Sequence, residues 1–98
     1  MTIEEIERWF EDDENSREFI KFERIVNPVH QRPDLCAFLM LDAIAPNPGR
    51  DLVSWAGHDE IALDFDVEAN ADKLTPDTLL TLHRCGVRFD GEGFRMFV

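Results

Sequence analysis

Hydrophobic and polar residues alternate strictly along residues 61–68, Ile-Ala-Leu-Asp-Phe-Asp-Val-Glu. The apolar side chains of one face are Ile61, Leu63, Phe65 and Val67. The opposite face carries Ala62 and three carboxylates, Asp64, Asp66 and Glu68. A period of two with β-branched and aromatic residues is typical of a strand with one buried face. The pattern predicts a strand over residues 61–68 whose outer face presents a row of carboxylates.

Helical periodicity occurs near both ends of the chain, and each predicted helix has its own N-terminal cap. Thr2 and Glu5 stand three residues apart, as a capping box requires, and apolar residues then recur at helical spacing. Near the other end, Thr75 precedes Pro76, and Gly86 follows the last predicted turn. Proline suits the first helical position, and glycine suits the position after the last. We expect one helix to begin after Thr2 and another to run from Thr75 to just before Gly86.

The segments between these helices are patterned less strongly. Asn15 and Glu18 form a further capping pair, which predicts a second helical stretch. Residues 22–26 fit a helix and a strand equally well, and both interpretations stay open. The prolines and the loop-forming residues of 27–33 predict a loop.

The run Leu35–Ala45 is apolar almost all round, so periodicity alone does not separate a buried helix from a buried strand. Its length and its alanine and leucine content favour a helix, with Asp34 as the N-cap and Pro46 as the stop. Because this helix lacks a polar face, we expect it to lie centrally, wrapped by the other elements.

The C-terminal residues predict a β-hairpin, with strands over 87–90 and 94–98 around a Gly-Glu-Gly loop. The residues of its core face are Val87, Phe89, Phe94, Met96 and Val98. The residues of its other face are Arg88, Arg95 and Phe97. We therefore predict a single α+β domain over residues 1–98. It has N-terminal helices, a central and mostly buried helix, and a small mixed or antiparallel sheet that ends in the hairpin.

The distribution of charge limits the possible functions. The 98 residues include 44% hydrophobic residues, enough for a packed core, and carry a net charge of −11. The excess acids are concentrated in residues 1–18 and 59–77. No basic stripe is available to neutralise phosphates, which excludes ordinary nucleic-acid binding. No apolar run approaches the roughly 20 residues that span a bilayer. Two cysteines without a signal-peptide pattern indicate reduced thiols in the cytoplasm.

We therefore expect a small acidic cytoplasmic protein that acts without catalysis, as an interaction or accessory module for a basic protein surface. A sharper form of this hypothesis is mimicry of nucleic acid, in which carboxylates take the place of phosphates. Mimicry requires the two acidic zones to share one exposed side of the molecule. Solubility alone is the simplest alternative explanation of the charge.

The row of carboxylates also suggests an alternative function, that of a metal-dependent hydrolase. Hard divalent cations bind clustered carboxylate oxygens, and Asp64 and Asp66 are the candidate ligands, with His58 near by. The nearest lysine is Lys73, and no second group of metal ligands follows. We therefore favour neither a metal site nor a catalytic residue.

Ion pairing is the favoured explanation of the same row. If the terminal hairpin pairs with the predicted strand, Arg88 and Arg95 meet the carboxylates. Such cross-strand pairs each contribute about 0.2–1 kcal/mol. The candidate partner-binding residues are Asp64, Asp66, Glu68, Asp59, Glu60, Arg88 and Arg95.

No cofactor is predicted. His30, Cys36, His83 and Cys85 are residue types that bind zinc, but they lack the paired spacing of a zinc site. The chain also contains no phosphate-binding loop, dinucleotide fingerprint or nucleophile-elbow motif.

Three short segments of the sequence bear on its similarity to other proteins. These are Arg32-Pro33-Asp34-Leu35, His58-Asp59-Glu60-Ile61 with Leu63-Asp64, and Arg84-Cys85-Gly86-Val87-Arg88-Phe89-Asp90. In their order they resemble strings of small uncharacterised proteins from phages and prophage-like regions. The resemblance covers residues 32–98 and not the N-terminal helix. It implies no activity, and it favours an accessory or host-interaction protein.

Overall fold

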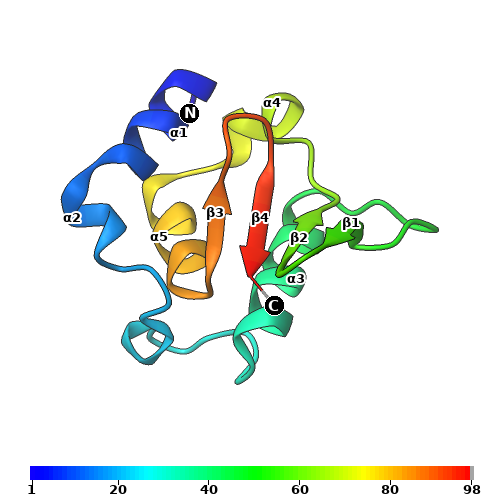
Figure 1. Cartoon of the computed structure of the whole chain (residues 1–98), viewed down its shortest axis with the longest axis horizontal. Coiled ribbons are helices and arrows are strands. Elements are labelled where there is room, and N and C mark those ends of the chain that lie inside the picture. Colours follow the sequence, from blue (N-terminus) through cyan, green and yellow to red (C-terminus); the bar gives the residue numbers. More distant parts are fainter. Residues whose placement is uncertain (98) are drawn as a thin grey trace.

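The computed structural model of the chain describes residues 1–97 and shows an α+β domain (Figure 1). Its α-helices are α1 (Ile3–Glu11), α2 (Asp13–Ser16), α3 (Pro33–Ile44), α4 (Val67–Asn70) and α5 (Pro76–Arg84). Two 3₁₀ turns are η1 (Phe22–Arg24) and η2 (Ala71–Lys73). The strands are β1 (Val53–Gly57), β2 (Glu60–Leu63), β3 (Val87–Phe89) and β4 (Phe94–Phe97).

The four strands form one antiparallel sheet in the order β1-β2-β4-β3. The terminal hairpin therefore pairs with β2 through β4. Side chains from one face of the sheet meet side chains from α1, α3 and α5 in the core. The largest fully buried side chains of this core are Ile6, Val67, Leu74, Leu79, Leu82, Val87 and Phe94. The opposite face of the sheet carries the outward residues of the hairpin.

Caps at the two predicted helix starts are confirmed. The backbone N–H of Glu5 donates to Thr2 Oγ1 over 3.1 Å, and the N–H of Thr2 donates to Glu5 Oε1 over 2.9 Å. At α5, the N–H of Thr78 donates to Thr75 Oγ1 over 3.2 Å. Gly86 follows α5 with a φ of 100°, a conformation that favours glycine. Each cap satisfies N–H groups that the helix itself leaves unpaired.

The predicted capping pair at Asn15 and Glu18 is wrong. Helix α2 begins earlier, and its cap is Asp12, whose carboxylate accepts from the N–H groups of Glu14 and Asn15. The Asn15 side chain instead donates to the carbonyl of Trp9 over 2.9 Å. Of the two open interpretations for residues 22–26, the structure shows a short 3₁₀ turn, η1, and no strand there.

The apolar run after residue 34 is a helix, as predicted, but its start and its burial differ from the expectation. Arg32 is the residue before the first turn of α3, and Pro33 occupies the first position, so Asp34 is not the N-cap. Only one stripe of α3 is buried, formed by Cys36, Ala37 and Leu41. Its other side reaches solvent, with Leu39 47% exposed.

The predicted strand over residues 61–68 is shorter than expected, because β2 ends at Leu63. The carboxylate of Asp66 accepts from the N–H of Ala69 and caps α4, so aspartate capping outweighs the alternating pattern. Phe65 and Val67 are still buried. The pattern therefore identified the core-facing residues correctly and the strand conformation correctly only as far as Leu63. Residues 70–73 are the end of α4 followed by η2.

The C-terminal hairpin is confirmed. Val87, Phe94 and Met96 are buried on its core face, and Phe97 is 54% exposed on the other face. The expectation for Val98 lies outside the described residues.

Candidate functional site

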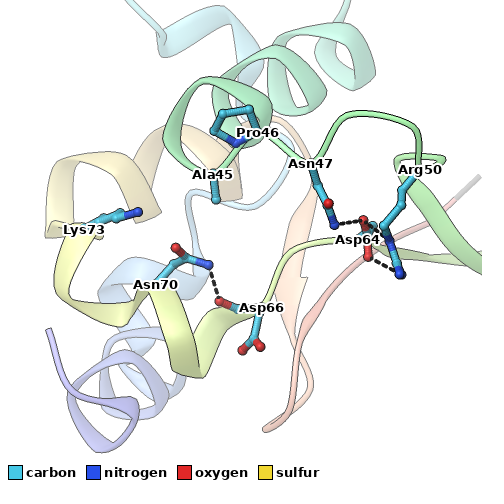
Figure 2. Close-up of a pocket in the computed structure, with 8 residues that line it drawn as sticks. All are labelled: Ala45, Pro46, Asn47, Arg50, Asp64, Asp66, Asn70 and Lys73. Atoms are coloured by element: carbon cyan, nitrogen blue, oxygen red, sulfur yellow. Dashed lines mark hydrogen bonds and ion pairs between the residues drawn. The ribbon is translucent and has the colours of Figure 1, made fainter.

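A polar hollow of about 510 Å³ lies between the end of α3 and the segment formed by α4 and η2 (Figure 2). Its lining residues are Ala45, Pro46, Asn47, Arg50, Asp64, Asp66, Asn70 and Lys73. Two of the predicted site residues, Asp64 and Asp66, therefore line one hollow.

Asp64 is held by an arginine from the loop that follows α3. Arg50 donates from Nε to Asp64 Oδ2 over 3.1 Å and from Nη2 to Oδ1 over 3.0 Å. The side-chain amide of Asn47 donates to the same Oδ2 over 3.1 Å. These bonds, that of Arg50 foremost, hold the pKa of the Asp64 carboxyl below its usual value. Both oxygens of Asp64 are thus engaged within the protein.

The side chain of Asp66 caps helix α4. Its Oδ1 accepts from the N–H of Ala69 over 3.0 Å, while the Asn70 side chain donates to its backbone carbonyl over 2.8 Å. Figure 2 shows the carboxylates of Asp64 and Asp66 pointing in different directions. They do not form the row that a straight strand would have produced.

The metal-dependent hydrolase gains no support from this geometry. Among residues 1–97, no three histidine, cysteine, aspartate or glutamate side chains gather closely enough to hold a metal ion. His58 lies in the turn between β1 and β2 and does not line the hollow. Lys73 lines the same hollow as the two acids.

The predicted pairing of Arg88 and Arg95 with Asp64 and Asp66 is wrong. Arg95 lies opposite Ala62 in the register of β4 against β2, so Asp64 falls beyond the paired residues. Both arginines instead contact Glu60, through a hydrogen bond from Arg88 and an ion pair of 3.8 Å from Arg95. Arg95 Nε also donates to Asp90 Oδ2 over 2.5 Å.

Aromatic residues accompany these arginines on the outer face of the sheet. The guanidinium carbon of Arg88 lies 4.0 Å from the centre of the Phe97 ring, and that of Arg95 lies 5.2 Å from the Trp55 ring. Trp55 is 48% exposed. Sequence reasoning placed Phe97 on this face and missed Trp55, whose ring meets Arg95 only because β1 pairs with β2.

The two acidic zones meet at one end of the molecule. Glu4 of α1, Glu68 of α4 and Glu92 of the hairpin loop line a hollow of about 640 Å³ together with Ile3 and Gly91. Beside it, a hollow of about 280 Å³ is lined by Glu7, Phe10, Glu11, Phe89, Asp90 and Gly91. We call Glu4, Glu7, Glu11, Glu68 and Glu92 the acidic end.

The N-terminal amino group links the start of α1 to η2. It donates to the carbonyl of Ala71 over 2.8 Å, which brings the start of α1 beside η2. In Figure 1, the start of α1, α4 and the β3–β4 turn lie together at the top. Residues of the zones 1–18 and 59–77 thus share an exposed side, which is the condition that nucleic-acid mimicry requires.

The histidine and cysteine residues have structural surroundings. His83 is buried, its Nδ1 lies 2.9 Å from the carbonyl oxygen of Val87, and its ring packs against those of Trp9, Phe10 and Phe19. Cys36 and Cys85 are buried free thiols. Burial, with the neighbouring Cys36, raises the pKa of the Cys85 thiol far above its ordinary value, which makes this thiol unreactive.

Comparisons of the chain with protein-family models, with curated proteins and with solved structures found no match. Among the described residues, no helix has the length and apolar character needed to cross a membrane.

Proposed function

We propose that this chain is a non-enzymatic interaction module that binds a basic protein partner through the acidic end. One observation carries the proposal. Glutamates from three separate segments converge on one side, and none of the five makes an ion pair within residues 1–97. Converging unpaired charges of one sign attract and orient an oppositely charged partner.

The surface beneath these carboxylates suits lysine and arginine side chains. Ile3, Phe10 and Phe89 are half-buried at the acidic end and leave apolar surface between the acids. Lysine and arginine lay their aliphatic stems on such surface while their charged groups reach carboxylates. A partner that normally binds nucleic acid presents such side chains, so nucleic-acid mimicry is the sharper form of the proposal.

We also propose a cytoplasmic location and an accessory role of phage or prophage type. The location is supported by the two reduced cysteines, and the role by the resemblance of residues 32–98 alone. Neither proposal depends on the geometry of the acidic end.

Binding of a peptide of alternating lysine and leucine residues tests the acidic end. The variant Glu4→Gln, Glu68→Gln, Glu92→Gln should lower the affinity at least about threefold, because exposed ion pairs contribute roughly 0.2–1 kcal/mol each. NMR titration of the labelled chain measures both the affinity and the residues that respond. Affinity should also fall as salt rises, because the Debye length shortens from about 10 Å at 0.1 M to 3 Å at 1 M.

A matched control separates recognition from net charge. The variant Glu23→Gln, Asp34→Asn, Asp42→Asn removes the same number of exposed acids from other surfaces. It should bind nearly as tightly as the native chain. An equal loss of affinity in both variants would show that the acidic end has no special role and that the charge serves only solubility.

A further inference from the structure

Strand β1 leaves one edge of the sheet open. It is outermost in the order β1-β2-β4-β3 and stands at the right of the sheet in Figure 1. The other edge strand, β3, packs against α1, with the rings of Phe10 and Phe89 6.0 Å apart. β1 packs mainly on β2, and Ser54, Trp55 and Ala56 are exposed. An edge strand presents unpaired N–H and C=O groups, which a further strand can bind.

The composition of β1 does not protect this edge. Its residues, Val-Ser-Trp-Ala-Gly, include no lysine, proline or acid, in a chain with 32% charged residues. Natural edge strands are usually blocked by such residues. A bulge between Val53 and Trp55 interrupts the register, and the Ser54 hydroxyl compensates by donating to the carbonyl of Ala62 over 3.2 Å. The remaining residues, Trp55 to Gly57, pair regularly with β2.

The charges around β1 indicate what binds there. Asp51 and Asp59 lie two residues outside the two ends of the strand; both are exposed, and neither makes an ion pair among the described residues. The neighbouring Arg50 already forms an ion pair with Asp64, and the neighbouring Glu60 forms one with Arg88. The open edge is thus an uncharged strand with an unpaired carboxylate beyond each end.

This layout disfavours a second copy of the chain as the occupant. In an antiparallel self-pair centred on Trp55, the middle residue of β1, Asp51 of each copy would lie opposite Asp59 of the other. Like charges in directly opposite positions are destabilising. A strand with a cation near each end has the complementary arrangement.

We propose that β1 is the docking edge for an extended segment of a basic partner protein, which joins the sheet as a fifth strand and places a lysine or arginine near Asp51 and near Asp59. The middle of that segment is uncharged, and a side chain beside Trp55 extends the aromatic outer face. The choice of a basic partner rests on the proposed function, whereas the choice of β1 rests on the open edge.

The test uses a synthetic peptide with lysine at both ends and alternating threonine and valine between them. NMR titration of the labelled chain should shift the amides of residues 53–57 and of Asp51 and Asp59. Two further peptides carry N-methyl groups on one or the other alternate set of residues. Because only one set faces β1, one N-methylated peptide should lose more than about tenfold in affinity and the other should bind almost normally.

Charge variants test the ends of the site. Asp51→Asn with Asp59→Asn should lower the affinity by roughly fivefold, since two exposed ion pairs are lost. The control variant, Asp42→Asn with Asp72→Asn, removes equal charge and should bind like the native chain. Equal losses in the two variants would overturn the assignment of the carboxylates.

The remaining outcomes separate this inference from the proposed function. Shifts confined to the acidic end, or binding that neither N-methylated peptide loses, would overturn docking on β1 and leave the proposed function standing. Concentration-dependent shifts of residues 53–57 without peptide, with a dimer in sedimentation, would make a second copy the occupant and overturn the proposal. Absence of binding at both surfaces would overturn both.

Discussion

Arg84 binds Glu18 across 66 positions of the chain. The guanidinium donates from Nε and Nη2 to Oε1 of Glu18 over 2.9 and 2.7 Å. Arg24 donates to the second oxygen, Oε2, over 2.5 Å. The carboxylate thus joins the segment that follows α2 to the last turn of α5 and to η1. Among the side-chain ion pairs of the described residues, the pair of Arg84 and Glu18 joins the residues that are farthest apart in the sequence.

The ion pair of Arg84 and Glu18 predicts that the stability of the fold depends on pH. Arg84 foremost lowers the pKa of Glu18 in the folded protein. A lowered folded pKa contributes stability that is fully present above the unfolded pKa, about 4.3, and is lost as pH falls through the folded value. The melting temperature of the native chain should therefore fall more steeply below about pH 4.3 than that of Glu18→Gln. Parallel curves for the two proteins would show that the pair does not stabilise the fold.

The cap of α5 should contribute measurably to stability. Thr75→Ala removes the acceptor of the Thr78 N–H bond, and the loss should be about 1 kcal/mol in the free energy of unfolding. Urea denaturation measures this loss. Thr75→Ser keeps a hydroxyl acceptor and is the matched control. A Thr75→Ala variant as stable as the control would contradict the role of the cap.

Divalent cations should not stabilise the native chain. Asp64 is engaged by Arg50 and Asn47, and Asp66 caps α4, so neither offers a free cluster of oxygens. The melting temperature should stay constant on addition of Mg²⁺, Mn²⁺ or Ca²⁺, because only a ligand bound to the folded state raises it. A rise that disappears in Asp64→Asn with Asp66→Asn would restore the metal-dependent hydrolase.

The bond between His83 and the Val87 carbonyl should stabilise the turn between α5 and β3. His83→Leu keeps apolar volume among Trp9, Phe10 and Phe19 but leaves the buried carbonyl without the imidazole. We expect a loss of about 1–3 kcal/mol in urea denaturation, the penalty for an unsatisfied buried polar group. A variant that matched the native chain would show that packing, and not this bond, fixes the histidine.

Local features of the fold were predictable from the sequence. The caps at Thr2 and Thr75 and the glycine after α5 depend on residues within four positions of one another, and the C-terminal hairpin joins two adjacent strands through a short loop. The alternation over 61–68 identified Leu63, Phe65 and Val67 as core residues, because burial follows hydrophobicity even where the backbone bends. The α+β class followed from these elements together.

Tertiary structure decided the rest, because it depends on which distant segments meet. β2 ends at Leu63 where Asp66 can cap α4, and Asp64 then meets Arg50, which is 14 positions away. Because of the register of β4 against β2, Arg88 and Arg95 contact Glu60 and not Asp64. The acidic end forms only when α1, α4 and the hairpin loop converge, and β1 becomes an edge only through the order of the strands. The sequence by itself determined the charge of each segment, the caps at Thr2 and Thr75 and the core-facing residues of 61–67, and packing decided which residues became neighbours.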